Sequence, residues 1–326
     1  MIDINSCKNL VFVKEYFEDV PYDVMRESLY SPSDLYDVLD MSDESSFDRC
    51  YDTRVYHHFI DTGKTEYSAM EALSRSLHDY SIRVALRKFL GQFRSWQAVG
   101  IMGGHGMRRT DSEYRDVVLV SKRLTEKGYL MISGGGPGAM EATHLGAWMA
   151  GRALSDVDEA LHILSAAPTF QDKDWLRSAM RVIRLFPQLG YNSLAIPTWL
   201  YGHEPATPFA THIAKMFENS IREETLLTIA HGGLIYVSGS AGTIQEIFQE
   251  AVQNHYESTG YASPMVFLGK DFWVNHVPIA PFFKHMVETG RYKNMILTFT
   301  DDIDDAIGAI ESFKEDEKKC DRGICK

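Results

Sequence analysis

Residues 129–141 read YLMISGGGPGAME, and this stretch decides the fold. A short apolar run (129–133) is followed by four glycines in five residues and then by an apolar segment of helical character. The pattern predicts a buried strand, a tight turn and a helix. Glycines let the backbone turn sharply, and they let an anion approach the N–H groups and positive dipole of the helix N-terminus.

We therefore expect a phosphate at this turn, although a tight turn without a ligand is the alternative. The residues expected to contact the phosphate or its ribose are Gly134, Gly135, Gly136, Pro137, Gly138, Met140 and Glu141.

The same alternation of short apolar runs and helical segments extends on both sides of this stretch. Five further strands are expected at 98–102, 192–197, 234–238, 264–269 and 294–299, and one long helix over 208–230. Short strands rich in Val, Ile and Leu that are separated by helices are typical of a parallel sheet covered on both faces. The sequence predicts an α/β, doubly wound parallel sheet flanked by helices, with ligands at the carboxyl ends of the strands.

The first 95 residues lack this regular alternation. They are rich in Asp, Glu, Ser and Tyr, and 70–93 has a helical pattern. We expect residues 1–95 to form a mainly helical N-terminal extension packed on the main domain, with a partly flexible arm as the alternative. Residues 96–315 would form the nucleotide-binding domain, and the charged residues 316–326 a flexible tail.

The amino-acid composition limits the classes of molecule that this protein is expected to bind. The formal net charge is -12 and the pI about 5.5, which gives no general attraction to a nucleic acid polymer or an anionic membrane. A small anion can still bind through local N–H groups and an arginine. No apolar run is long enough to cross a membrane, and no signal peptide is recognised. The scattered cysteines Cys7, Cys50, Cys320 and Cys325 predict free thiols, no metal site and a cytoplasmic location.

A second glycine-containing turn, SGSAGTIQE, occupies residues 238–246. It again follows a strand and opens a helix, and its small residues leave backbone N–H groups accessible. Thr243 adds a hydroxyl, and Glu246 either faces the same pocket or complements the helix dipole. No lysine follows, so this is not a Walker A loop. The phosphate-binding candidates here are Gly239, Ser240, Ala241, Gly242 and Thr243.

Three weaker signals accompany the two turns. Arg222 either reaches a phosphate or ribose, or pairs on a solvated helix face. Gly103, Gly104 and His105 end the first strand and could form a third wall, although a lone histidine is more often structural or solvated. The loop 197–209 carries aromatic residues that could stack on a nucleobase or pack at the surface.

Together these motifs resemble the LOG family, a Rossmann-like group once labelled possible lysine decarboxylases that includes nucleoside 5′-monophosphate phosphoribohydrolases. The family pattern is GGGxxGxM at one turn and PGGxGTxxE at the other, with an Arg-Lys pair before the second. GGGPGAM (134–140) matches the first, and SGSAGTIQE matches the second at Gly239, Gly242, Thr243 and Glu246. Ser238, Ser240 and Glu223 depart from the pattern.

The resemblance implies hydrolysis of the N-glycosidic bond of a nucleoside 5′-monophosphate, with Glu246 and Arg222 as catalytic residues, no cofactor, and a homodimer or higher homo-oligomer. A carboxylate beside the ribose would stabilise the oxocarbenium character that develops as the bond breaks. Two alternatives stay open. One is a non-catalytic nucleotide carrier or sensor. The other is a dinucleotide enzyme using Gly134, Gly136 and Ala139, with Glu159 at the required spacing.

Overall fold

The computed structural model describes residues 17, 19–65 and 67–315, so the predicted tail lies outside the described residues, as do Cys7, Cys320 and Cys325. A seven-stranded sheet forms its centre, and all of its strand pairs are parallel. In chain order the strands are β1 (Ala98–Met102), β2 (Leu130–Ser133), β3 (Ser193–Ala195), β4 (His212–Ile213), β5 (Leu234–Tyr236), β6 (Pro264–Leu268) and β7 (Ile296–Thr300).

The strand order is β4-β3-β2-β1-β5-β6-β7, so the winding direction reverses between β1 and β5. This is the doubly wound, Rossmann-like order with one additional strand, β4, at an edge. The predicted α/β fold is confirmed. In such sheets the crevice at the reversal point, outside the carboxyl ends of the strands, is where ligands bind.

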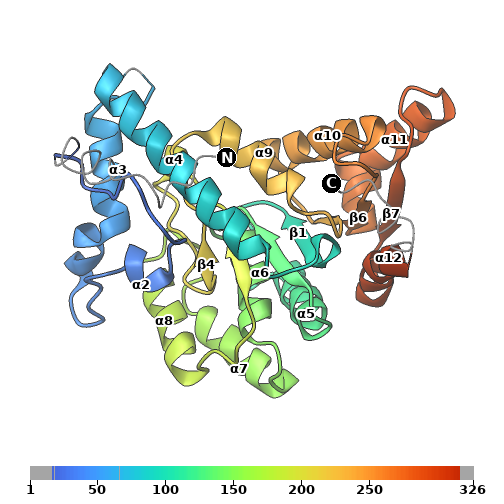
Figure 1. Ribbon diagram of the computed structural model, residues 1–326. Helices are drawn as coiled ribbons and strands as arrows, with labels where there is room; N and C mark the ends of the chain where they lie inside the picture. Colours follow the sequence, from blue (N-terminus) through green and yellow to red (C-terminus); the bar gives the residue numbers. More distant parts are fainter. Residues whose placement is uncertain (1–16, 18, 66, 316–326) are drawn as a thin grey trace.

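Side chains alternate between the two faces of the sheet and build two separate cores. On β1, Val99 and Ile101 join one core, while Ala98 and Met102 join the other. The first core is completed by α5 (Ser112–Glu126), α6 (Ala139–Trp148), α7 (Leu154–Leu164), α8 (Trp175–Leu185) and α12 (Ile303–Glu315). The second is completed by α9 (Asn219–Thr228), α10 (Ala241–Tyr256) and α11 (Ile279–Glu288). Helices therefore cover both faces (Figure 1).

The long helix expected over 208–230 is wrong. Residues 212–213 form β4, and α9 begins only at Asn219. The backbone of this segment pairs on both sides, because Ala214 N–H donates to Ala195 of β3 at 2.8 Å and Ile213 exchanges hydrogen bonds with Tyr30. This tertiary pairing outweighs the local helical pattern, since it satisfies backbone groups that a helix would otherwise satisfy.

The N-terminal segment contributes α2 (Pro32–Leu35), the 3-10 helix η2 (Glu44–Arg49), α3 (Tyr51–Asp61) and the long α4 (Ala69–Leu90). In Figure 1 these elements lie at one end of the molecule, with α4 running across toward β1. Val55, Phe59 and Ile82 are buried in the same core as the β2–β3 end of the sheet. The division of the chain at residue 95 stays a prediction, but the described part of the extension has no separate core of its own.

Two buried polar contacts attach the extension to the sheet domain. Asp79 on α4 accepts hydrogen bonds from the N–H groups of Phe217 (2.9 Å) and Glu218 (2.8 Å), which immediately precede α9. Asp52 on α3 accepts from the Lys215 ammonium at 2.6 and 2.8 Å and from the Trp199 indole at 2.9 Å. Both contacts hold the segment 199–218, which leads from β3 to α9.

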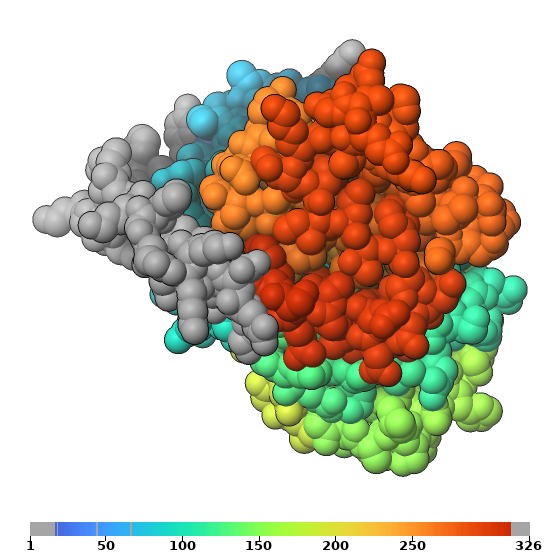
Figure 2. Space-filling model, turned by 90° about the vertical axis from the view of Figure 1, so that its right-hand side faces the viewer, coloured from blue at the N-terminus to red at the C-terminus, as the bar shows by residue number. Residues whose placement is uncertain are grey.

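The opposite side of the molecule is formed by the C-terminal elements. Figure 2 shows C-terminal residues, including β7, α11 and α12, making up most of that surface, with residues of α5 and α7 below them. Within the described residues, no helix combines the length and apolarity needed to cross a bilayer.

The Asp52–Lys215 pair should be essential for stability. Asp52→Ala leaves a fully buried ammonium without its counter-charge, and we expect the free energy of unfolding to fall by about 3–5 kcal/mol. The control is Glu311→Ala, which removes the exposed pair with Lys127 and should cost less than about 1 kcal/mol. Urea titrations followed by circular dichroism measure both losses, and equal losses would contradict the assignment.

Candidate functional site

A cavity of about 260 Å³ lies at the carboxyl ends of β1, β2 and β5, at the reversal point of the sheet. Loops that follow four different strands, together with α9, contribute to it. Its lining includes Gly103, Gly104, His105, Gly134, Gly136, Met140, Tyr201, Glu204, Arg222, Glu223, Ser240, Ala241, Gly242, Thr243 and Glu246. The structure thus brings together most of the residues that the two glycine turns predicted.

The first turn needs glycine because it packs directly on the loop after β1. Gly138 has φ +67°, and a Cβ there would collide with the carbonyl groups of Gly104 and His105. The N–H of Ala139, the first residue of α6, donates to Gly104 at 3.2 Å. The two loops are therefore held as one unit, and no side chain caps the N-terminus of α6.

Gly134 makes room for Arg222. A Cβ at Gly134 would collide with the Arg222 guanidinium and with the Met140 sulfur. Arg222 is only 7% exposed; its Nε donates to the carbonyl of Ile196 at 2.7 Å and its Nη1 to Glu223 at 2.6 Å. The arginine is therefore fixed in the wall of the cavity and is not on a solvated helix face.

The second turn presents a helix N-terminus to the cavity. Within the described part of the chain, no hydrogen bond occupies the backbone N–H groups of Ala241, Gly242 and Thr243, and α10 has no side-chain cap. Ser238 faces the other way: its N–H donates to Glu113 at 2.7 Å, and its hydroxyl binds the same carboxylate. Ser238 thus anchors the turn to α5 and leaves the next N–H groups free.

Two acidic side chains meet beside Arg222. Glu246 (8% exposed) lies on α10, Glu223 (6% exposed) lies on α9, and the two carboxyl groups share a hydrogen bond. Burial, and then the adjacent charge of Glu223, raise the pKa of Glu246 to about 8 against the opposing effect of Arg222. Glu246 therefore carries a proton over much of the neutral range.

Tyr201 and Glu204 form the rim of the cavity. Both come from the loop after β3, where Trp199 is fully buried while Tyr201 is 46% exposed. The Glu204 carboxylate lies 3.5 Å from Nδ1 of His105, so the loop after β3 reaches the loop after β1. The rim therefore offers one aromatic ring and one acceptor to whatever part of a ligand lies farthest from the glycine turns.

Several predicted residues lie away from this lining. Pro137, Gly138 and Glu141 line an adjoining cavity of about 220 Å³ that shares His105. Glu141 is fully buried there and binds the Arg109 guanidinium at 2.5 and 2.8 Å. Gly135 and Gly239 line neither cavity. The acidic residue of the dinucleotide alternative, Glu159, is an exposed residue of α7 and does not end a strand.

Six lining residues were not among the predicted site residues: Pro197, Thr198, Tyr201, Glu204, Glu223 and Gln245. Glu223 stood out in the sequence only as a departure from the Arg-Lys pair. Tyr201 and Glu204 belong to a loop whose aromatic content was noted, but their orientation depends on the burial of Trp199 against the N-terminal extension. Among the described residues, no group of three or more His, Cys, Asp or Glu side chains is arranged to hold a metal ion.

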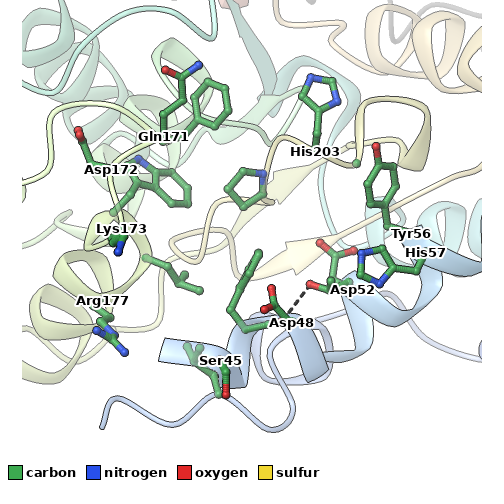
Figure 3. A pocket seen from close by; sticks show the side chains of 18 of the residues that line it. Ser45, Asp48, Asp52, Tyr56, His57, Gln171, Asp172, Lys173, Arg177 and His203 are labelled. Carbon is green, nitrogen blue, oxygen red and sulfur yellow. Dashed lines mark hydrogen bonds between the residues drawn. The ribbon is translucent and has the colours of Figure 1, made fainter. Parts of the chain in front are cut away.

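A larger cavity, of about 700 Å³, lies between the N-terminal extension and α8. Figure 3 shows Tyr56 and His57 of α3 on one side of it and Gln171, Asp172 and Lys173 on the other. Its buried carboxylate, Asp52, is already saturated by Lys215 and Trp199. Its lining has no glycine-rich turn, although the N-terminus of α8 at Trp175 lies in it and also lacks a side-chain cap.

The chain matches no protein-family model, and no curated protein matches it in sequence. Solved structures do resemble it. A structural-genomics structure of TM1055 is 20% identical, with a TM-score of 0.42, and covers 66% of this chain and 98% of its own. The molybdenum cofactor binding protein of Rippkaea orientalis is 12% identical, with a TM-score of 0.41, over 66% of this chain and 96% of its own. The Moco carrier protein of Chlamydomonas reinhardtii is 15% identical, with a TM-score of 0.38, over 67% of this chain and 97% of its own.

The glycines of the two turns should differ in what they tolerate. Gly138→Ala forces a positive φ on alanine and a collision with two carbonyl groups, so we expect a loss of stability of at least about 1–3 kcal/mol. Gly242→Ala meets no atom within 4 Å in the first turn of a helix, so stability should be unchanged or up to about 1 kcal/mol higher. Thermal unfolding by calorimetry compares them, and a costlier Gly242→Ala would refute this account of the turns.

Proposed function

We propose that this protein hydrolyses the N-glycosidic bond of a nucleoside 5′-monophosphate and releases the free base and ribose 5-phosphate. One observation carries the proposal. The uncapped N-terminus of α10, a buried arginine and a buried glutamic acid converge on a single cavity at the reversal point of the sheet, and Gly134, Gly136 and Met140 of the first turn line the same cavity.

The phosphate is expected between the two turns, where the N–H groups of Ala241, Gly242 and Thr243 are free and the dipoles of α6 and α10 favour a negative charge. Arg222 would neutralise part of that charge and orient the sugar. Binding energy from the phosphate, which does not react, would thus position the scissile bond.

The ribose is expected beside Glu246. Breaking the bond between the base and the anomeric carbon builds positive charge on the sugar ring, and an ionised Glu246 would stabilise that charge or take a proton from the attacking water. The motifs GGGPGAM and SGSAGTIQE support assignment to the LOG family, and with it a homodimer or higher homo-oligomer in the cytoplasm.

A carrier or sensor for the same class of ligand is the second candidate, and one observation favours it. Because the pKa of Glu246 is raised to about 8, this group is mostly protonated and uncharged at pH 7. An uncharged acid does not stabilise an oxocarbenium ion, whereas it leaves phosphate binding undisturbed.

Base release distinguishes the two functions. We expect the protein to release base from at least one member of a panel of nucleoside monophosphates, measured by chromatography. Because ionised Glu246 is the active form and its pKa in the free protein lies near 8, kcat/KM should rise with pH from 6 to 8 and level off above about pH 9.

Glu246→Gln should lower kcat by at least about a hundredfold while calorimetry shows retained nucleotide binding. Glu224→Gln, on the exposed face of α9, is the matched control and should retain full activity. Nucleotide binding without base release from any member of the panel would establish the carrier and defeat the hydrolase.

A further inference from the structure

Glu223 is a buried acid that the proposed reaction does not yet use. It lines the cavity, accepts a hydrogen bond from Arg222 at 2.6 Å and shares another with Glu246. We propose that Glu223 is a positioning residue that makes the two carboxyl groups hold one proton between them, so that the cavity takes up a sugar phosphate together with a proton. This inference rests on the proposed function only in placing a sugar phosphate in this cavity.

The charges in the cavity require such a proton. Among the described residues that line it, Arg222 is the only lysine or arginine. A phosphate dianion beside two ionised carboxylates and one guanidinium would leave a large uncompensated negative charge in a buried site. Two carboxyl groups in hydrogen-bond contact do not both ionise readily, and retaining one proton between them removes one of the negative charges.

The surroundings of the pair supply no other charge compensation. Tyr236, the last residue of β5, is a neighbour of Glu250 and Glu246, and its buried hydroxyl has no hydrogen-bond partner in the described chain. Glu250, one turn along α10, is itself a buried acid that accepts from the Ser263 hydroxyl at 2.6 Å. On the cavity side the titratable neighbours are Tyr201, His105 and Glu204, and the last two pair with each other across the rim.

The direction of the coupling follows from burial. Because burial and Glu223 raise the pKa of Glu246, the free protein begins to lose the shared proton only near pH 8. A bound dianion raises that pKa further, so binding above pH 8 takes up a proton and weakens as the pH rises. A lysine at position 223, the residue of the family pattern, would instead compensate the phosphate directly and would remove the need for the proton.

Calorimetric titration with ribose 5-phosphate, which has no glycosidic bond to cleave, tests the coupling independently of catalysis. Between pH 7.5 and 9.5 the phosphate is already a dianion, so its own titration does not interfere. We expect the affinity of the wild-type protein to fall by close to tenfold for each pH unit above 8, which is the slope for one linked proton. Buffers of different ionisation enthalpy should report an uptake that approaches about one proton per ligand in the same range.

Two substitutions isolate Glu223. In Glu223→Gln, Arg222 is free to pair with Glu246, so Glu246 should ionise below pH 7.5 and the affinity should change by less than about threefold per pH unit. Glu223→Lys should bind more tightly than the wild type, again with a flat profile. Glu224→Gln is the exposed control on the same helix and should keep the wild-type slope. A merely structural role for Glu223 would lower affinity equally at every pH.

The two proposals fail in different ways. Equal pH slopes in the wild type and Glu223→Gln, or no binding of ribose 5-phosphate by the folded protein at pH 7.5, would overturn proton-coupled binding. Nucleotide cleavage accompanied by equal slopes would leave the hydrolase standing without this coupling. Proton-coupled binding that is lost in Glu223→Gln, but without base release from any nucleotide, would support the inference and defeat the hydrolase.

Discussion

The buried guanidinium of Arg222 is the contact on which the candidate site depends. It joins the first glycine turn, the carbonyl of Ile196 after β3, and Glu223 on its own helix. A guanidinium presents its donors in a fixed planar fork, so these partners cannot shift independently. Position 134 requires glycine because the Arg222 guanidinium occupies the space that a side chain would fill. The position of α9 therefore sets the shape of the cavity.

The N-terminal extension contributes to the site through that helix. Asp79 on α4 accepts from the two backbone N–H groups that precede α9, and Asp52 on α3 holds Lys215 and Trp199 in the segment leading to it. All four of these partners lie within 199–218, the segment that also carries the rim residues Tyr201 and Glu204. The extension thus does more than cover the edge of the sheet, because it fixes the region that closes one side of the cavity.

The features that could be predicted from the sequence are the strands and turns, which depend on local chemistry. Short apolar runs separated by helical segments identified six of the seven strands, and the first turn was recognisable because the positive φ of Gly138 and the close approach of Arg222 to Gly134 demand glycine. Contacts between distant segments were not predictable. β4 has two residues and exists only because β3 and Tyr30 pair with it. The sequence marked Glu223 only as a departure from an Arg-Lys pair, because its hydrogen bond with Glu246 depends on the relative placement of α9 and α10. Glu141 followed the turn directly, yet Arg109 holds it in the neighbouring cavity.

The central claim is that the two glycine turns bind one and the same phosphate. Backbone amide chemical shifts in a nitrogen-15 labelled sample, followed during titration with a nucleoside monophosphate, test this most directly. The account predicts that the amides of Gly134–Gly138 and of Gly239–Thr243 move together and fit a single dissociation constant. Shifts confined to one turn, or to the larger cavity around Tyr56 and His57, would contradict it.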